Sequence, residues 1–343
     1  MFKARFIPLN VTQAASQLKR SSHCLVVSPT QDAAIVFGGE LQPRVPVDNA
    51  LHKIALPSGN YELKNVLTPT PAPPPRVGSA LTFAKESLWV WGGRGGVSME
   101  CLPEKGYVWR FKSGEWTRIE CDGEPPQDRS YHVMVTYNED LFVHAGCPAT
   151  GRLSDLYRLS LASPKPVWTK LADAPGPGRG GTVLGVIPAL SSFVRWGGFA
   201  GYELGGPLDI YHVPTNTWHS VDVAGEQPAK RSVHALVGLR GAPRSDGIVA
   251  LMLFGEGEAS DLGHAGAGKF HDDAWALVKA PLTELTEGWS WEKLVIPEDS
   301  SKPQARGWFA ADAWADGKVV FQGGLNTDNE RLGDAWVLEV GKK

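Results

Sequence analysis

The sequence predicts an all-β protein, a six-bladed β-propeller, and three observations lead to this prediction. The chain of 343 residues has 39 glycines, 26 prolines and 13 tryptophans but only 4 methionines, which is typical of many short strands joined by tight turns. A pattern of about fifty residues recurs six times along the chain. The last copy ends after its third strand, which leaves a place that the N-terminal segment can fill.

Each copy of the pattern opens with an arginine, followed by the small or apolar run that we take as its first strand. The arginines are Arg20, Arg76, Arg129, Arg179, Arg231 and Arg306. All six copies carry one, so we expect these arginines to have a structural role between blades. In the first, third and fifth copies, a histidine follows three residues later. These are His23, His132 and His234, for which repetition favours packing over catalysis.

The second strand of each copy is an apolar run that ends in glycine. The runs are AIVFGG, LWVWGG, LFVHAG, FVRWGG, LMLFG and VVFQGG. They are too short for helices, and the glycines permit the positive φ of a turn after a buried strand. A third strand follows, often opened by aspartate as in LDIYHVP and DDAWALV. A fourth carries a tryptophan in four copies, so each copy has the four strands of a propeller blade.

The sixth copy has no fourth strand, because the chain ends at Lys343 just after its third. We predict that residues 3–11, KARFIPLNV, supply it, which closes the ring and removes an exposed sheet edge. No single copy can bury both of its faces, so residues 1–343 are expected to form one domain. Its blades should begin near residues 20, 76, 129, 179, 231 and 306.

Composition also restricts the partners and the compartment. The net charge of −3 gives no reason to expect nucleic acid or an acidic membrane surface as a partner. The sequence has no 18-residue apolar stretch and no signal-peptide pattern. Its four cysteines lie far apart without CxxC spacing, so they are interpreted as reduced, structural thiols. We therefore expect a soluble cytoplasmic protein.

The diglycine after an apolar strand, the aromatic third strand and the later tryptophan resemble the kelch repeat over essentially the whole chain. The segments WGGRGG, GCPATGRLSDLY, LGHAGAGKF and GGLNTDNERLGDAW more closely resemble plant specifier proteins: the nitrile-specifier, epithiospecifier and thiocyanate-forming proteins. That resemblance implies an enzyme that directs the breakdown of unstable glucosinolate aglycones, with ferrous iron as cofactor. It also implies that Arg94 and Arg152 contact an anionic substrate and that blade five holds a metal site.

The iron motif of that family places an aspartate four residues after a glutamate, and a histidine four residues after the aspartate. Glu256 and His264 match it, whereas Ser260 stands at the aspartate position and Asp261 comes one residue late. Glu256, Asp261 and His264 could offer two oxygens and one imidazole to Fe(II) or another divalent ion. Alternatively, the carboxylates cap turns in this glycine-rich loop and the protein needs no cofactor.

Further candidates follow the second strands, in loops that gather at one mouth of a propeller channel. Arg94 and Arg152 follow their glycines in equivalent loops of adjacent blades, where two guanidinium groups could clamp sulfate, phosphate or carboxylate. Alternatively, each pairs with a nearby carboxylate, such as Glu100 or Asp155.

Three polar residues hold similar loop positions in the remaining blades: Glu40, Tyr202 and Asn326. Each could bind substrate through hydrogen bonds or simply be a solvated loop residue. Trp308 breaks the pattern of its copy, and its indole could stack on a flat substrate.

We expect a small-molecule enzyme that acts on a reactive or anionic intermediate at the propeller mouth, by lyase, isomerase or cyclisation chemistry. Arg94, Arg152 and His264 would be its catalytic residues, and no hydrolytic motif such as GxSxG is present. The substrate would carry an acidic or polar group. The alternative is a non-catalytic kelch module that binds a protein partner. Convergence of the loop residues Arg94, Arg152, Glu256 and His264 in one cavity of a few hundred Å³ would favour the enzyme. A mouth that is flat and apolar across several blades would favour the protein partner.

Overall fold

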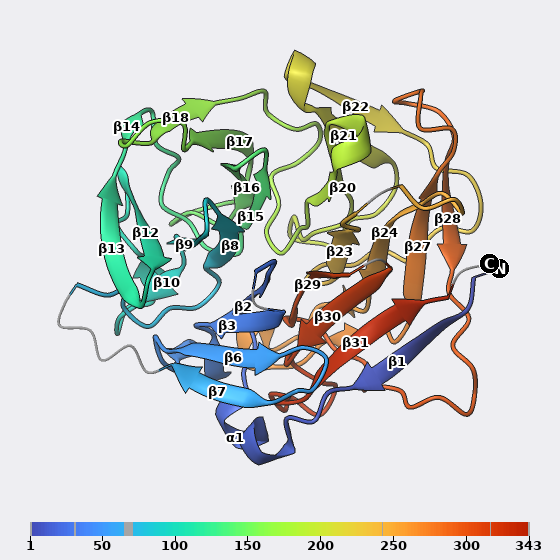
Figure 1. Cartoon of the computed structure of the whole chain (residues 1–343), viewed down its shortest axis with the longest axis horizontal. Coiled ribbons are helices and arrows are strands. Elements are labelled where there is room, and N and C mark those ends of the chain that lie inside the picture. The colour runs from blue at the N-terminus through green and yellow to red at the C-terminus, as the bar shows by residue number, and fades with distance from the viewer. Residues whose placement is uncertain (1, 31, 65–70, 242, 316, 342–343) are drawn as a thin grey trace.

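The computed structural model describes residues 2–30, 32–64, 71–241, 243–315 and 317–341. Within these residues, six antiparallel sheets are arranged as blades around a central channel (Figure 1), which confirms the predicted propeller. In five blades, the first strand begins four residues after the arginine of the repeat. No helix in the described part of the chain is long and apolar enough to cross a membrane.

The blades follow one another along the chain, each with its first strand at the channel. Blade one consists of β2 (Cys24–Ser28), β3 (Ala33–Phe37), β6 (Leu51–Ala55) and β7 (Tyr61–Lys64), and blade two of β8 (Ala80–Ala84), β9 (Ser87–Trp91), β12 (Tyr107–Lys112) and β13 (Glu115–Glu120). Blade three consists of β15 (Val133–Tyr137), β16 (Asp140–Gly146), β17 (Leu153–Ser160) and β18 (Val167–Lys170), with β14 (Asp122–Gly123) added in parallel to β18.

The second half of the ring repeats this order. Blade four consists of β19 (Gly185–Ile187), β20 (Ser192–Arg195), β21 (Leu208–His212) and β22 (Thr217–Val221), and blade five of β23 (Ala235–Gly238), β24 (Ile248–Leu253), β27 (Ala274–Lys279) and β28 (Trp289–Lys293). Blade six consists of β29 (Ala310–Trp314), β30 (Lys318–Gln322), β31 (Ala335–Val340) and, from the start of the chain, β1 (Ala4–Pro8).

The N-terminal strand completes blade six, as predicted. β1 pairs antiparallel with β31, from Ala4 opposite Val340 to Pro8 opposite Trp336. The regular strand is shorter than residues 3–11, because the chain then turns into the short helical segments η1 (Thr12–Ala14) and α1 (Ala15–Leu18). The ring is thus closed by main-chain hydrogen bonds between the two ends of the chain (Figure 1).

Three blades carry small hairpins between their second and third strands. These are β4–β5 (Glu40–Gln42, Val45–Pro46), β10–β11 (Arg94–Gly95, Glu100–Cys101) and β25–β26 (Glu256–Glu258, Lys269–Phe270), the last with the turn η4 (Gly263–Ala265). Because all connections between second and third strands leave the same end of the propeller, these hairpins gather around one mouth of the channel.

The arginines of the repeat are structural, as expected. Each donates a hydrogen bond from Nη1, at 2.8–3.1 Å, to the carbonyl oxygen of the residue before the last glycine of its own second strand. Five of them also pair with a carboxylate. The pairs are Arg20–Asp48, Arg76–Glu104, Arg129–Asp155, Arg231–Asp273 and Arg306–Asp334. Each arginine therefore ties the turn after the second strand to the segment before the first.

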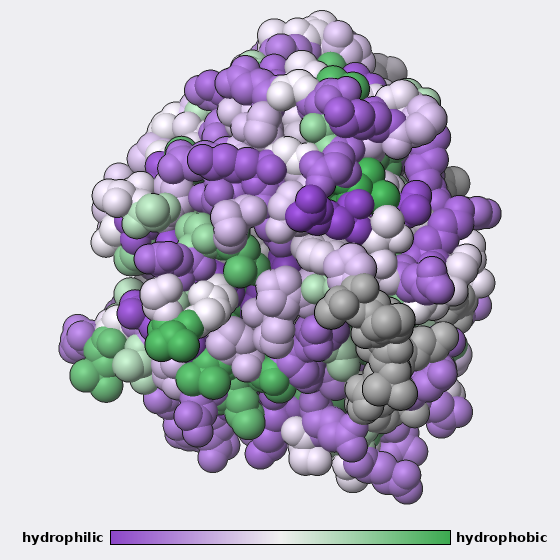
Figure 2. Space-filling view, turned by 90° about the vertical axis from the view of Figure 1, so that its left-hand side faces the viewer, coloured by the Kyte–Doolittle hydropathy of each residue, from purple (hydrophilic) through white to green (hydrophobic). Residues whose placement is uncertain are grey.

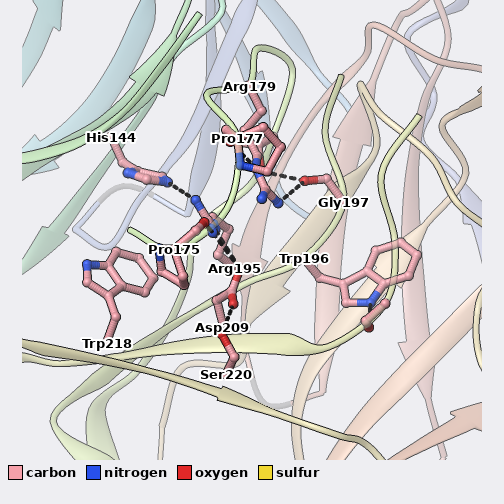
Figure 3. Close-up of polar contacts among 12 residues, drawn as sticks. His144, Pro175, Pro177, Arg179, Arg195, Trp196, Gly197, Asp209, Trp218 and Ser220 are labelled. Atoms are coloured by element: carbon pink, nitrogen blue, oxygen red, sulfur yellow. Dashed lines mark hydrogen bonds and ion pairs between the residues drawn. The ribbon is translucent and has the colours of Figure 1, made fainter. Parts of the chain in front are cut away.

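Blade four departs from this scheme (Figure 3). There, Arg195 on β20 donates to Asp209 Oδ2 at 3.0 Å through Nε and to Pro175 O at 2.6 Å through Nη2. Among the residues that the structure describes, Arg179 pairs with no carboxylate. Burial and the neighbouring Arg195 lower the pKa of Arg179 to about 10.

The repeated histidines pack between blades. The ring of His132 lies edge-on to Trp91 of the preceding blade, with centroids 5.2 Å apart, and His234 lies in the same way against Trp196. Burial and the nearby repeat arginine lower the pKa of His23, His132 and His234 to about 3, so all three are neutral. This supports the expected packing role.

Apolar side chains fill the spaces between adjacent sheets, in clusters that join neighbouring blades. In contrast, the outer face shown in Figure 2 is predominantly hydrophilic, with apolar residues in small groups. The apolar side chains between adjacent blades therefore hold the ring together.

Candidate functional site

A cavity of about 280 Å³ opens at the mouth and is called the mouth cavity below. It is lined by side chains from five of the six blades. They include Glu40, Tyr131, Cys147, Arg152, Phe199, Ser232, Glu256, His264, Trp308 and Arg331. This is the place where a propeller can touch one ligand with several blades.

The floor of the mouth cavity is a closed ring of main-chain hydrogen bonds, which we call the mouth ring. Each blade contributes the residue two positions after its repeat arginine. The amide of this residue donates to the carbonyl oxygen of the equivalent residue in the preceding blade, at 2.7–3.0 Å. The ring residues are Ser22, Gly78, Tyr131, Gly181, Val233 and Trp308, all with φ between 44° and 62°. Such strained backbone at non-glycine residues is typical of functional positions. Here it fixes where Tyr131 and Trp308 stand.

Glu40 and His264 meet in the centre of the cavity. The loop of blade five brings His264 across the mouth, and its Nε2 lies 3.1 Å and 3.3 Å from the two carboxylate oxygens of Glu40 in blade one. The hydroxyl of Tyr131, from blade three, lies 3.3 Å from the same nitrogen. Burial and the Glu40 carboxylate raise the pKa of Tyr131 well above its usual value, so its phenol keeps its proton.

Aromatic rings surround this contact. The ring of Trp308 stands perpendicular to that of His264, with centroids 5.3 Å apart, and to that of Tyr131, at 5.5 Å. Trp308 thus forms part of the cavity wall, where its indole could stack on a flat ligand.

Two carboxyl groups with raised pKa values lie on the side of blades four and five. Burial raises the pKa of Glu256 to about 7, against its usual 4.5. Burial and the charge of Glu256 also raise the pKa of Glu203 to about 7. The Glu203 carboxylate accepts a hydrogen bond from Ser232 Oγ at 3.1 Å. A carboxyl group that titrates near neutral pH can both give and take a proton.

The two arginines that were predicted to clamp an anion lie in different places. Arg152 lines the mouth cavity at its rim, exposed, with its guanidinium 4.8 Å from the ring centre of Phe199. Arg94 instead donates to Ser130 Oγ at 2.7 Å and to Pro148 O at 2.8 Å, which ties its hairpin to blade three. The two arginines hold different places in their loops: Arg94 directly follows Gly93, the last glycine of its second strand, whereas Arg152 comes six residues after Gly146.

The remaining predicted contacts also differ in place. Asn326 is buried and caps its own loop: its Oδ1 accepts from the amides of Asp328 and Glu330. Tyr202 is exposed at the rim. Tyr131, Phe199 and Glu203 were not predicted. Phe199 directly follows the last glycine of its second strand, as Glu40 and Glu256 do, so its position offered a signal. Tyr131 holds a repeated position whose residue type differs from blade to blade.

The three residues proposed as metal ligands do not fit a metal ion in this arrangement. His264 Nε2 is occupied by Glu40 and Tyr131, while Asp261 is exposed on the loop and Glu256 accepts from the amide of Gly268. Within the described residues, no group of three or more His, Cys, Asp or Glu side chains stands where it could hold a metal.

Comparisons with known proteins agree with the fold. Residues 22–242 match the KLHDC2/KLHL20/DRC7 Kelch-repeats domain. In the solved structure of YjhT, 98% of that chain superposes on 94% of this one with a TM-score of 0.67 at 12% identity, which shows the shared fold alone.

Relatives by sequence are kelch proteins of several kinds. Leucine-zipper-like transcriptional regulator 1 homolog of Drosophila melanogaster is 26% identical over 64% of this chain, and Kelch domain-containing protein 2 of Bos taurus is 22% identical over 79%. Adagio protein 3 of Arabidopsis thaliana is 28% identical over 89%. The chain spans 23%, 68% and 46% of these proteins, respectively. They do not show closeness to the plant specifier proteins. With its six blades and this family match, the chain belongs to the kelch-repeat proteins.

Proposed function

We propose that the mouth of the propeller is a recognition face for a protein partner, which covers the rim and inserts one side chain into the mouth cavity. The observation that carries this proposal is the distribution of exposed apolar side chains. Seven large ones stand out among the described residues, and five lie in loops between second and third strands. These five are Leu41, Val45, Val97, Tyr202 and Leu262, called the apolar rim below.

An apolar rim around a cavity fits a partner better than a free metabolite. Exposed apolar side chains that come from four blades and surround one opening mark an interaction surface, whereas single ones scattered over a protein do not. Their exposure is high: 74% for Leu262 and 61% for Tyr202. Burial of such side chains by a partner contributes about 25 cal/mol per Å² of apolar area. The anchor in the cavity then provides specificity.

The test compares three immobilised proteins as baits for one extract, with bound proteins quantified by mass spectrometry. The rim variant carries Val97→Ser, Tyr202→Ser and Leu262→Ser. The matched control carries Val167→Ser and Val295→Ser, the two exposed apolar residues away from the mouth. We expect a partner that wild type and control retain and that the rim variant loses at least about tenfold, or about 1.4 kcal/mol. Equal retention by all three baits would contradict the proposal.

A small-molecule enzyme with isomerase, lyase or cyclase chemistry is the second candidate. It is supported by Glu203 and Glu256, whose carboxyl groups both have a pKa of about 7. In this case, Glu256 would transfer a proton to or from a ligand held against Trp308, with Arg152 at the rim near its acidic group.

The two candidate functions should be abolished by different substitutions. A ligand found by thermal-shift screening should stop turning over with Glu256→Gln, while Glu258→Gln on the same loop, where Glu258 is exposed and pairs with Lys269, serves as control. Turnover that persists in Glu256→Gln would refute proton transfer by this residue.

A further inference from the structure

We infer that the mouth cavity contains a pocket for a protonated nitrogen group, which the chain's own His264 fills in this structure and which a basic side chain of a partner takes over. The inference rests on the proposed function and names the side chain that the partner inserts. Its components are Glu40, Tyr131 and Trp308, called the nitrogen pocket below.

The acceptor of the nitrogen pocket is a buried carboxylate that needs donors. Glu40 is 2% exposed, and its Oε2 accepts from the amide of Arg44 at 2.7 Å. Oε1 lies 3.5 Å from Ser22 Oγ and 3.6 Å from Arg331 Nη2. His264 Nε2, at 3.1 Å, is closer to Oε1 than either. A buried carboxylate without such a partner is strongly destabilised, so whatever replaces His264 must also donate a hydrogen.

The walls of the pocket suit a cation. The rings of Tyr131 and Trp308 both lie within 6 Å of the imidazole, with centroid distances of 5.9 Å and 5.3 Å. Aromatic rings beside a carboxylate favour ammonium, guanidinium and imidazolium groups, through cation–π attraction and charge-assisted hydrogen bonds. Tyr131 and Trp308 are both residues of the mouth ring, so main-chain hydrogen bonds hold their backbone in place before any ligand arrives.

The present occupant is attached more loosely than the pocket. His264 lies in the turn η4, and its neighbours Gly263 and Ala265 are exposed. Asn329 Nδ2 donates to Ala265 O at 3.1 Å, which links this loop to blade six near the protein surface. Release of His264 requires this hydrogen bond to break and the loop to move, while Glu40, Tyr131 and Trp308 stay in place. His264 acts as an internal ligand that a stronger donor displaces.

The charged groups of the cavity lining do not add up to a negative excess, so the attraction for a cation comes from Glu40 itself. Glu40 and Glu256 are the acidic groups of the lining, and Arg331, His264 and the rim residue Arg152 are the basic ones. When His264 leaves, Glu40 loses this hydrogen-bond donor. A lysine, arginine or protonated histidine from the partner restores the hydrogen bond and places a positive charge beside the carboxylate.

The experiment uses small probes, so it does not depend on knowing the partner. His264→Ala vacates the pocket. Calorimetric titration at about pH 6, where free imidazole is largely protonated, then measures binding of imidazole and methylguanidinium. We expect both cations to bind His264→Ala at least about tenfold more tightly than wild type. Pyrazole, which has the same ring size without the charge, and acetate should show no such gain.

Two double variants test the pocket itself. Glu40→Gln in the His264→Ala background removes the acceptor, and Trp308→Ala in the same background removes a wall, so one serves if the other does not fold. Each should abolish the gain. Equal binding of pyrazole, or no gain for the cations in His264→Ala, overturns the inference. None of these variants touches the apolar rim, so that result leaves the rim experiment to judge the proposed function separately.

Discussion

Glu104 provides the sharpest test of how the repeat arginines hold the ring. Its carboxylate is 1% exposed, accepts three hydrogen bonds and forms an ion pair with Arg76. Oε1 lies 2.9 Å from Arg76 Nη2, as an ion pair, and accepts from the indole of Trp109 at 2.8 Å. Oε2 accepts from Arg76 Nη1 at 3.0 Å and from the amide of Gly92 at 2.8 Å. Glu104→Ala therefore leaves the buried guanidinium of Arg76 without its carboxylate, and the N–H groups of Trp109 and Gly92 without this acceptor.

The expected loss follows from these contacts. Breaking a buried ion pair from one side destabilises a protein by about 3–5 kcal/mol, and an unsatisfied buried N–H by about 1–3 kcal/mol. The two effects overlap, so we expect a free energy of unfolding lower by about 4 kcal/mol. Asp334→Ala is the matched control, since Asp334 also contacts both terminal nitrogens of its repeat arginine, Arg306, but its side chain is 37% exposed. Water can take the place of the Asp334 carboxylate there, so we expect the free energy of unfolding to fall by only about 1–2 kcal/mol.

Urea unfolding, followed by tryptophan fluorescence and circular dichroism together, measures both losses. A third protein, with Arg76→Met and Glu104→Leu, replaces the pair by apolar groups and should return to within about 2 kcal/mol of wild type. The reasoning fails if Glu104→Ala loses no more than Asp334→Ala, or if the double variant is as unstable as Glu104→Ala.

Three further predictions concern the site, the turns and the closure of the ring. Burial raises the pKa of Glu256 to about 7, so the folded state holds this proton more tightly than the unfolded chain. That contribution to stability is complete below the ordinary pKa of 4.5 and is lost as pH rises through 7. Glu256→Gln should therefore flatten this part of a plot of Tm against pH. An unchanged plot would contradict the raised pKa of Glu256. Gly92→Ala should destabilise by about 2–4 kcal/mol in urea, because φ is 68° and the new Cβ would lie 2.6 Å from His132 Cε1. Gly106→Ala has a similar φ of 76° but open space around it, so it should lose only about 1 kcal/mol; equal losses would argue against the inter-blade contact. Deletion of residues 1–9 should expose the edge of β31 and cause association detectable by light scattering, and a monodisperse product of unchanged Tm would show that β1 is dispensable.

The fold was predictable because the repeat carries its own geometry. The last glycine of each second strand has φ between 93° and 112° in all six blades, a region that other residues rarely adopt. The glycines are Gly39, Gly93, Gly146, Gly198, Gly255 and Gly324. A residue type required by backbone conformation at a fixed spacing is visible in sequence. The strand bounds and the closing β1 follow from that register.

The candidate site was predictable in location but not in its contacts. Repeat register brought Glu40, His264 and Trp308 to one mouth. Their pairing depends on the path of the loop in blade five, which belongs to no repeat and crosses to blade one. Tyr131 escaped notice for the opposite reason: its position repeats, but with serine, glycine, valine or tryptophan in the other blades. The shared property is a positive φ, and it leaves no common residue type.

Blade four shows why a repeat predicts partners poorly once one position changes. Arg195 stands on β20 where the corresponding positions of the other blades are apolar, as in Val143 of blade three. A buried guanidinium must find an acceptor, and Asp209, the acid that the repeat would give to Arg179, is within reach (Figure 3). Arg179 keeps its bond to Gly197 O and loses its carboxylate. One substitution in a strand thus redirects a contact fourteen residues away along the chain, and only the packing of side chains across the sheet reveals it.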